Sequence, residues 1–144
     1  MKKPSASHLD AARRLFEREA HGVDGAEERA AAAQRVYDKM ISHLGTLVGS
    51  SAARALFARS VKLAAPDFAC LGKIVPAIER GESLGEQFVI CMRGEPPDAV
   101  TEATVTLLAT LFALLGTLIG ERLTAKILRD AYPAFRVAPE EETK

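Results

Sequence analysis

Apolar residues recur along most of the chain at the three- and four-residue spacing of amphipathic helices. In the segment after Asp98, bulky apolar side chains gather on one helical face and small residues gather on the other. After Gly120 the apolar stripe moves to the formerly small face. Because one straight helix cannot bury both stripes against the same neighbour, we predict that a helix ends at Gly120 and that the chain turns there.

The same arrangement occurs 71 residues earlier, around a nearly identical six-residue phrase. LGTLVG spans Leu44–Gly49, and LGTLIG spans Leu115–Gly120. The apolar stripe again changes sides at the last glycine of the phrase, Gly49, which we predict to be a second helix turn. We interpret the segments 24–65 and 98–136, in approximate bounds, as duplicated units of helix, glycine turn and helix.

Further helix boundaries are predicted from capping residues and from glycine. Ser7 is expected to begin a helix that runs to about Ala20, and His21 with Gly22 forms its stop. These signals place one more helix ahead of the first unit. The other expected N-caps are Asp24, Ser50 or Ser51, Ser83 and Asp98.

The middle of the chain, 66–97, is predicted to be a broken helical connector. Pro66 closes the helix before it. Pro76 is expected to disfavour a long helix through 71–80, because proline lacks a donor and clashes with the preceding turn. No alternating strand pattern occurs. The sequence therefore predicts an all-α fold, with one domain, 1–144, that forms a bundle of about five to seven helices.

Composition narrows the class of protein. Of 144 residues, 48% are hydrophobic and 26% are charged, as in folded soluble domains. Nineteen basic and nineteen acidic residues cancel, so we expect no nucleic-acid partner. No apolar stretch follows the basic residues at the start, so no secretory signal is predicted and a cytoplasmic location is expected. Cys70 and Cys91 are then expected to be two reduced, buried thiols, with a disulfide or a reactive thiol as the alternatives.

The segment 103–120 carries no charge and ends in a Gly-x-x-x-Gly pair, so it also resembles a membrane helix. Four threonines dilute its hydrophobicity, no aromatic belt brackets it, and the equivalent segment around Leu44 carries charged residues. We therefore expect no membrane insertion. The segment is predicted to be a centrally buried helix whose small face lets a neighbouring helix approach closely.

Candidate chemistry is sparse. The chain has three histidines, His8, His21 and His43. Their spacing builds no metal site, and no Lys-Ser/Thr follows the glycine phrases as it would in a phosphate loop. Arg54, Arg59 and Lys62 share a helical face that could meet an acidic partner, although a solvated face is the simpler explanation. We predict no catalytic residue, no metal and no cofactor.

The segments LLGTLIGERLTAKILRDAYP and LVGSSAARALFARSVKLA carry a resemblance. They resemble a group of short bacterial proteins built around a C-terminal helix of the type LxGxxLTxxLLRxAxP. The resemblance covers about two thirds of the chain. It implies a bacterial, soluble, helical protein and assigns no activity to any residue.

Little chemistry and much apolar helical surface favour a non-enzymatic interaction or regulatory module that binds another protein and forms a homodimer. The helix expected to contact the partner carries one apolar stripe, Leu9, Ala12, Leu15 and Phe16. A first alternative is a sensor or carrier of a small apolar ligand, bound between the duplicated units. Its expected lining is Tyr37, Met40, Phe88, Leu111 and Phe112. A second alternative is an enzyme whose site assembles only in the fold.

Overall fold

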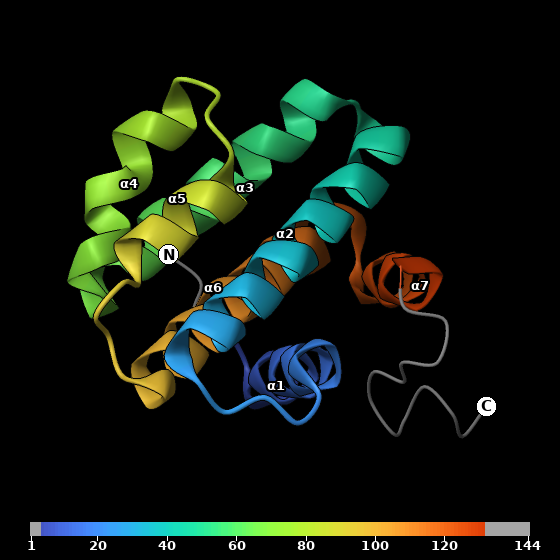
Figure 1. The fold of residues 1–144 in the computed structure, drawn as a ribbon. Coiled ribbons are helices and arrows are strands. Elements are labelled where there is room, and N and C mark those ends of the chain that lie inside the picture. Colours follow the sequence, from blue (N-terminus) through green and yellow to red (C-terminus); the bar gives the residue numbers. More distant parts are fainter. Residues whose placement is uncertain (1–3, 132–144) are drawn as a thin grey trace.

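A computed structural model describes residues 4–131 of the chain (Figure 1). These residues form seven α-helices and one 3-10 turn, with no strand among them, which confirms the all-α prediction. The expected end of the second unit, residue 136, lies outside this range. The elements are α1 (Ala6–Ala20), α2 (Ala26–Val48), α3 (Ser50–Ala64), η1 (Ala65–Asp67), α4 (Ala69–Glu79), α5 (Leu84–Cys91), α6 (Pro97–Ile119) and α7 (Glu121–Ala131).

Two helices of equal length, α2 and α6, form the centre of the bundle. Each has 23 residues, and the two run side by side in the same general direction (Figure 1). Thirteen residues of α6 are buried, against eight of α2. Among the described residues, α6 alone is long and apolar enough to cross a membrane, and 61% of its most apolar stretch is buried inside the bundle. Its hydrophobicity is therefore largely used in packing.

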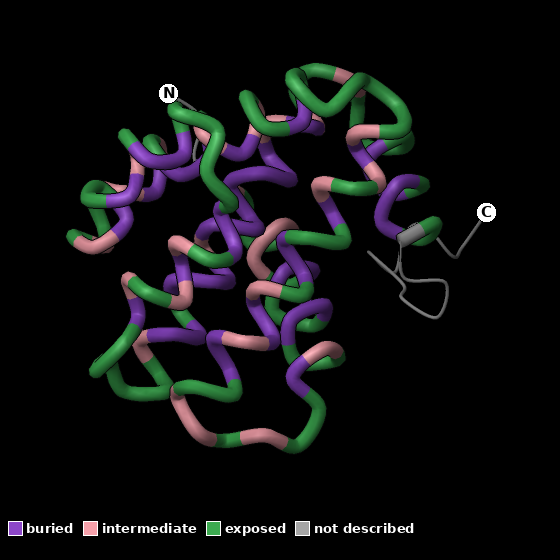
Figure 2. Tube along the Cα trace, turned by 45° about the horizontal axis from the view of Figure 1, so that its top comes forward, coloured by how far each residue is buried: buried purple, intermediate pink, exposed green. Residues whose placement is uncertain are grey.

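The other helices cover this central pair. α1 packs on α6 and α2, whereas α5 packs on α2. α3 and α7 each follow one central helix and contact both of them, and α4 packs on α3 and α5. Figure 2 shows buried residues on the inward sides of the helices and exposed residues on the outer sides and loops. Each central helix is thus covered by segments that lie far from it in the sequence.

Arg29 ties α1 and α6 to α2 from inside the bundle. This residue is only 9% exposed. Its Nε donates to Thr101 Oγ1 at 2.8 Å, one terminal nitrogen donates to the Val23 carbonyl at 2.7 Å, and the other pairs with Glu17. The guanidinium also lies 5.1 Å from the centre of the Phe16 ring. These partners offset the penalty of burying the charge.

The two glycine turns share one backbone geometry. Gly49 has φ 95° and ψ 149°, and Gly120 has φ 93° and ψ 154°. This region is populated almost only by glycine. The Gly49 N–H donates to the Gly45 carbonyl at 2.9 Å, and the Gly120 N–H donates to the Gly116 carbonyl at 3.0 Å. The equivalence of the backbones extends the similarity of the two phrases, and an internal duplication stays a prediction.

The first glycine of each phrase faces the start of the helix that follows the turn, at ordinary distance for Gly45 and closely for Gly116. A Cβ at Gly45 would lie 3.7 Å from the Ser50 Cα, and a Cβ at Gly116 would meet the Glu121 carboxylate. At Gly116 the neighbouring helix that approaches the small face of α6 is α7, the helix that directly follows. The Gly-x-x-x-Gly pair belongs to the turn.

Several predicted helix starts are wrong by one or more residues. Ser5 caps α1, and its hydroxyl accepts a hydrogen bond from the His8 N–H at 3.1 Å. Ser83 is confirmed as the N-cap of α5, where it accepts from the Glu86 N–H at 3.2 Å. The residues expected as caps that do not serve as caps are Ser7, Asp24, Ser50, Ser51 and Asp98. Glycine or proline precedes three of these helices and sets the entry of the chain in their place.

The prediction that Pro76 disfavours a long helix through 71–80 is also wrong. α4 runs through Pro76, which lies within its last turn. Proline leaves the carbonyl of Gly72, four residues earlier, without its helical donor. Gly72 and Pro76 are both exposed, so water can solvate that carbonyl. The usual cost of an internal proline is reduced at this position.

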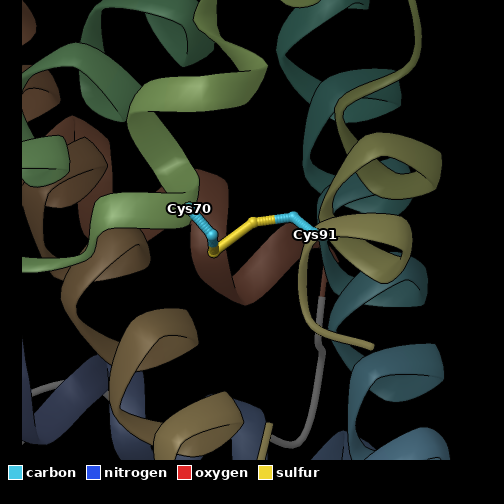
Figure 3. Close-up of a disulfide and its surroundings, with 2 residues drawn as sticks. All are labelled: Cys70 and Cys91. Atoms are coloured by element: carbon cyan, nitrogen blue, oxygen red, sulfur yellow. A yellow bond between two sulfur atoms is a disulfide. The ribbon is translucent and has the colours of Figure 1, made fainter. Parts of the chain in front are cut away.

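The expectation of two reduced, buried thiols is wrong as well. Cys70, at the start of α4, and Cys91, at the end of α5, form a disulfide with a Cα–Cα distance of 5.7 Å (Figure 3). Both residues are half-buried. Their separation of 21 residues hides the pairing, because only the turn between α4 and α5 brings the two helix ends together. The disulfide closes the open end of this helical hairpin.

Candidate functional site

The five residues expected to line a ligand pocket lie in the packed core. Phe112 is 1% exposed, and the other four have no exposed surface: Tyr37, Met40, Phe88 and Leu111. The Tyr37 ring packs edge-on against Phe88, with the ring centres 5.2 Å apart. These side chains line none of the clefts described below. They hold the central helices together.

Tyr37 brings one unsatisfied polar atom into this core. Its hydroxyl has no hydrogen-bond partner among the described residues. Burial raises the pKa of Tyr37 well above its ordinary value, and the neighbouring Thr104 side chain opposes that shift. The Thr104 hydroxyl instead donates to the Val100 carbonyl at 2.8 Å. The tyrosine is thus held neutral within the core.

The stripe expected to contact a partner is covered within the chain. Ala12, Leu15 and Phe16 are buried, and Leu9 is half-buried. Their helix, α1, packs on α6 and α2. The stripe therefore covers the central helices in this structure and is not a free surface.

A cleft opens where the α4–α5 hairpin meets α2 and α3. Its volume is about 300 Å³. The lining residues are Asp38, Ile41 and Ser42 of α2, Arg54 and Phe57 of α3, Ile78 of α4, Gly81, Glu82 and Ser83 of the turn, and Leu84 of α5. Apolar side chains supply the floor, and charged and hydroxyl groups supply the rim. This combination is typical of a recognition site.

A second hollow, of about 360 Å³, adjoins the cleft. The two share Arg54, Ile78 and Gly81. The second hollow extends over Ser51 and Ala55 of α3 and over the end of α4. Together the two hollows form a half-open groove, and Arg54 lies where they meet. We call the two hollows together the Arg54 groove.

Most charges around the Arg54 groove are already paired. Glu82 accepts hydrogen bonds from Arg80 at 3.0 Å and from Gln87 at 3.1 Å. Glu79 pairs with Lys62 of α3. Each of these carboxylates has a cation or a donor beside it. Neither therefore gives the rim a strong negative charge.

Two charged groups in the groove have no such partner. Arg54 and Asp38 form no hydrogen bond or ion pair with any described residue. Partial desolvation raises the pKa of the Asp38 carboxyl, and the negative charge of Glu86 raises it further. Within residues 4–131, the groove therefore offers one cation and one carboxylate without a partner beside an apolar floor.

Glycine and the disulfide fix the wall that faces α2 and α3. Gly81 has a φ of 94° in the tight turn between α4 and α5. Gly85 lets α5 approach α2 closely, because a Cβ there would lie 2.7 Å from Gln34 Cγ. The Cys70–Cys91 bond closes the opposite end of the hairpin. The hairpin is thus fixed at its turn, at its contact with α2 and at its open end.

Metal chemistry finds no support in the described part of the chain. Residues 4–131 contain no group of three or more His, Cys, Asp or Glu side chains placed to hold a metal ion. His8 bonds to Ser5 and, at 3.2 Å, to Glu121, so it links α1 to α7. His43 lines neither part of the Arg54 groove.

The helical pattern of the sequence does not reveal the groove as a site. It placed Arg54 on a face with Arg59 and Lys62, yet Lys62 pairs with Glu79 and Arg54 lines the groove. The helical pattern showed these residues as polar and exposed, which is correct. It contained no signal that the turn at Gly81 lies against that face, since this contact joins distant segments.

Comparisons with protein-family models, with curated proteins and with solved structures find no match to the chain. The resemblance to short bacterial helical proteins therefore stays a prediction. The function has to be argued from the groove and the fold.

Proposed function

We propose that the chain is a non-enzymatic interaction module that binds a segment of another protein in the Arg54 groove. The observation that supports this is the groove itself: two adjoining hollows with an apolar floor, a polar rim and two unpaired charges. Helical grooves of this kind accept amphipathic segments, whose apolar side chains enter the floor while polar groups meet the rim.

The form of the groove favours a protein segment over a compact ligand. The hollow is open and continues past Arg54 in two directions, so an elongated occupant fills it better than a small molecule. A carrier of a small apolar ligand has less support, because the five residues expected to line its pocket pack against one another in the core. We therefore keep the protein-binding interpretation.

A blocked groove tests the proposal. Short random peptides displayed on phage are selected on the full chain and then measured against Ser42→Trp, which places an indole in the cleft. Lys73→Trp, on the exposed face of α4 and outside the groove, is the matched control. We expect enriched peptides that bind the wild type and the control but do not bind the Ser42→Trp variant. No enrichment, or equal binding to both variants, would refute the proposal.

Self-association stays a separate prediction. Among residues 4–131, four of the five exposed large apolar residues lie at the two glycine turns: Leu47, Val48, Leu118 and Leu123. Both turns lie at the same end of the bundle (Figure 1). Light scattering over a range of concentrations tests whether this end associates. A mass of one chain throughout would exclude a homodimer.

A further inference from the structure

The two unpaired charges of the Arg54 groove place a constraint on its occupant. Arg54 stands where the two hollows meet, and Asp38 lines only the cleft. The cleft floor between them comes from Ile41, Phe57 and Leu84. Both side chains are exposed beside this floor, so an occupant that covers the floor comes within their reach and displaces part of their water. A group of opposite charge on the occupant offsets that loss.

The other charges of the groove do not meet that need. Arg80 is held by Glu82, and Lys62 is held by Glu79. Asp38 and Arg54 also do not pair with each other, since no hydrogen bond or ion pair joins them. Glu86 lies near enough to Asp38 to add repulsion and no compensation. The missing partners must therefore come from the bound segment.

We infer that the segment bound in the Arg54 groove carries an acidic residue opposite Arg54, a basic residue opposite Asp38, and apolar residues between them. This inference rests on the proposed function and names the chemistry of the partner. The order of the two charges also sets the direction in which the segment lies. A carboxylate suits Arg54 because its guanidinium can donate two parallel hydrogen bonds to it.

Charge exchange at Arg54 tests this inference. Selection of random peptides on the wild type is expected to enrich sequences with one acidic and one basic residue flanking apolar positions. Selection on Arg54→Glu is expected to replace the acidic residue with a basic one. Peptides from the wild-type selection should bind Arg54→Gln about tenfold more weakly, because a hydrogen bond to a charged group is lost.

Arg59→Glu is the matched control, because Arg59 lies on the same helix, is exposed, and lines neither part of the groove. It should leave both the selected sequences and their affinities unchanged. Arg54→Gln keeps the test valid if the Glu variant does not fold, and circular dichroism checks both.

The outcomes separate the inference from the proposed function. Peptides that require an open groove but show no charge preference, or that bind Arg54→Gln as well as the wild type, would overturn the inference alone. An equal effect of Arg59→Glu would also overturn it, since the charge would then act at long range. A selection without any groove-dependent peptide would overturn both.

Discussion

Alanine at the two turn glycines tests the geometry on which the bundle is built. Gly49 and Gly120 both have a φ near 95°, in a region that side-chain-bearing residues rarely adopt. No atom lies within 4 Å of the position that a Cβ would take at either glycine. The cost of Gly49→Ala and of Gly120→Ala therefore comes from the backbone alone.

The expected magnitude follows from two opposing effects. A residue held in a sparsely populated backbone region costs about 1–3 kcal/mol. Alanine restricts the unfolded chain more than glycine does, which returns about 0.4–1 kcal/mol. Each substitution should thus lower the free energy of unfolding by about 1–2 kcal/mol. The two values should agree closely, because the two turns differ by only a few degrees.

Gly45→Ala is the matched control, since Gly45 lies inside α2 and a Cβ there makes only ordinary contacts, the nearest at 3.7 Å. Removing a glycine from a helix interior should raise the free energy of unfolding by about 0.5–1 kcal/mol. Urea unfolding followed by circular dichroism measures all three variants. Unchanged or increased stability of Gly49→Ala and Gly120→Ala, with the control as expected, would refute the turn geometry.

Three further predictions concern the hairpin and the core. Replacing Cys70 and Cys91 with serine should lower the free energy of unfolding by about 3 kcal/mol, because the loop between them is no longer closed in the unfolded chain. If a reductant left the unfolding midpoint of the wild type unchanged, this prediction would be contradicted. Gly85→Ala should cost about 1–3 kcal/mol in chemical unfolding, since its Cβ would overlap Gln34, and a neutral result would mean that α5 packs less closely on α2. Tyr37→Phe should leave stability at neutral pH unchanged or raised by about 1 kcal/mol, because the lost hydroxyl is buried without a bond. Since burial raises the pKa of Tyr37, the wild type should lose stability above about pH 10 relative to this variant, and equal alkaline unfolding of the two would show that the hydroxyl is not buried.

Helical periodicity predicted the larger elements because their pattern is local. The change of stripe at Gly49 and Gly120 marks where α2 and α6 end, and the all-α class follows from the same pattern. Cap positions were less accurate, since glycine and proline set several helix starts without a side-chain cap. Pro76 was misjudged because the sequence does not show that the carbonyl it leaves free is exposed.

Contacts between distant segments were beyond the sequence. The disulfide and the Arg54 groove both depend on where the α4–α5 hairpin lies against α2 and α3. Periodicity reports which face of a helix is polar, but it does not identify the segment that packs beside that face. The burial of Arg29 has the same origin, because its partners come from α1, α6 and the loop before α2.

The covering of α6 by α1 has a consequence for synthesis on the ribosome. α1 ends at Ala20, and α6 begins only at Pro97. At about 5–20 residues per second, roughly 4–15 seconds pass before α6 starts to be made. During that time α1, which carries Leu15 and Phe16, lacks one of the two central helices on which it packs. A nascent chain of this protein therefore exposes an apolar helix early, and a chaperone that binds such segments would have its longest opportunity there.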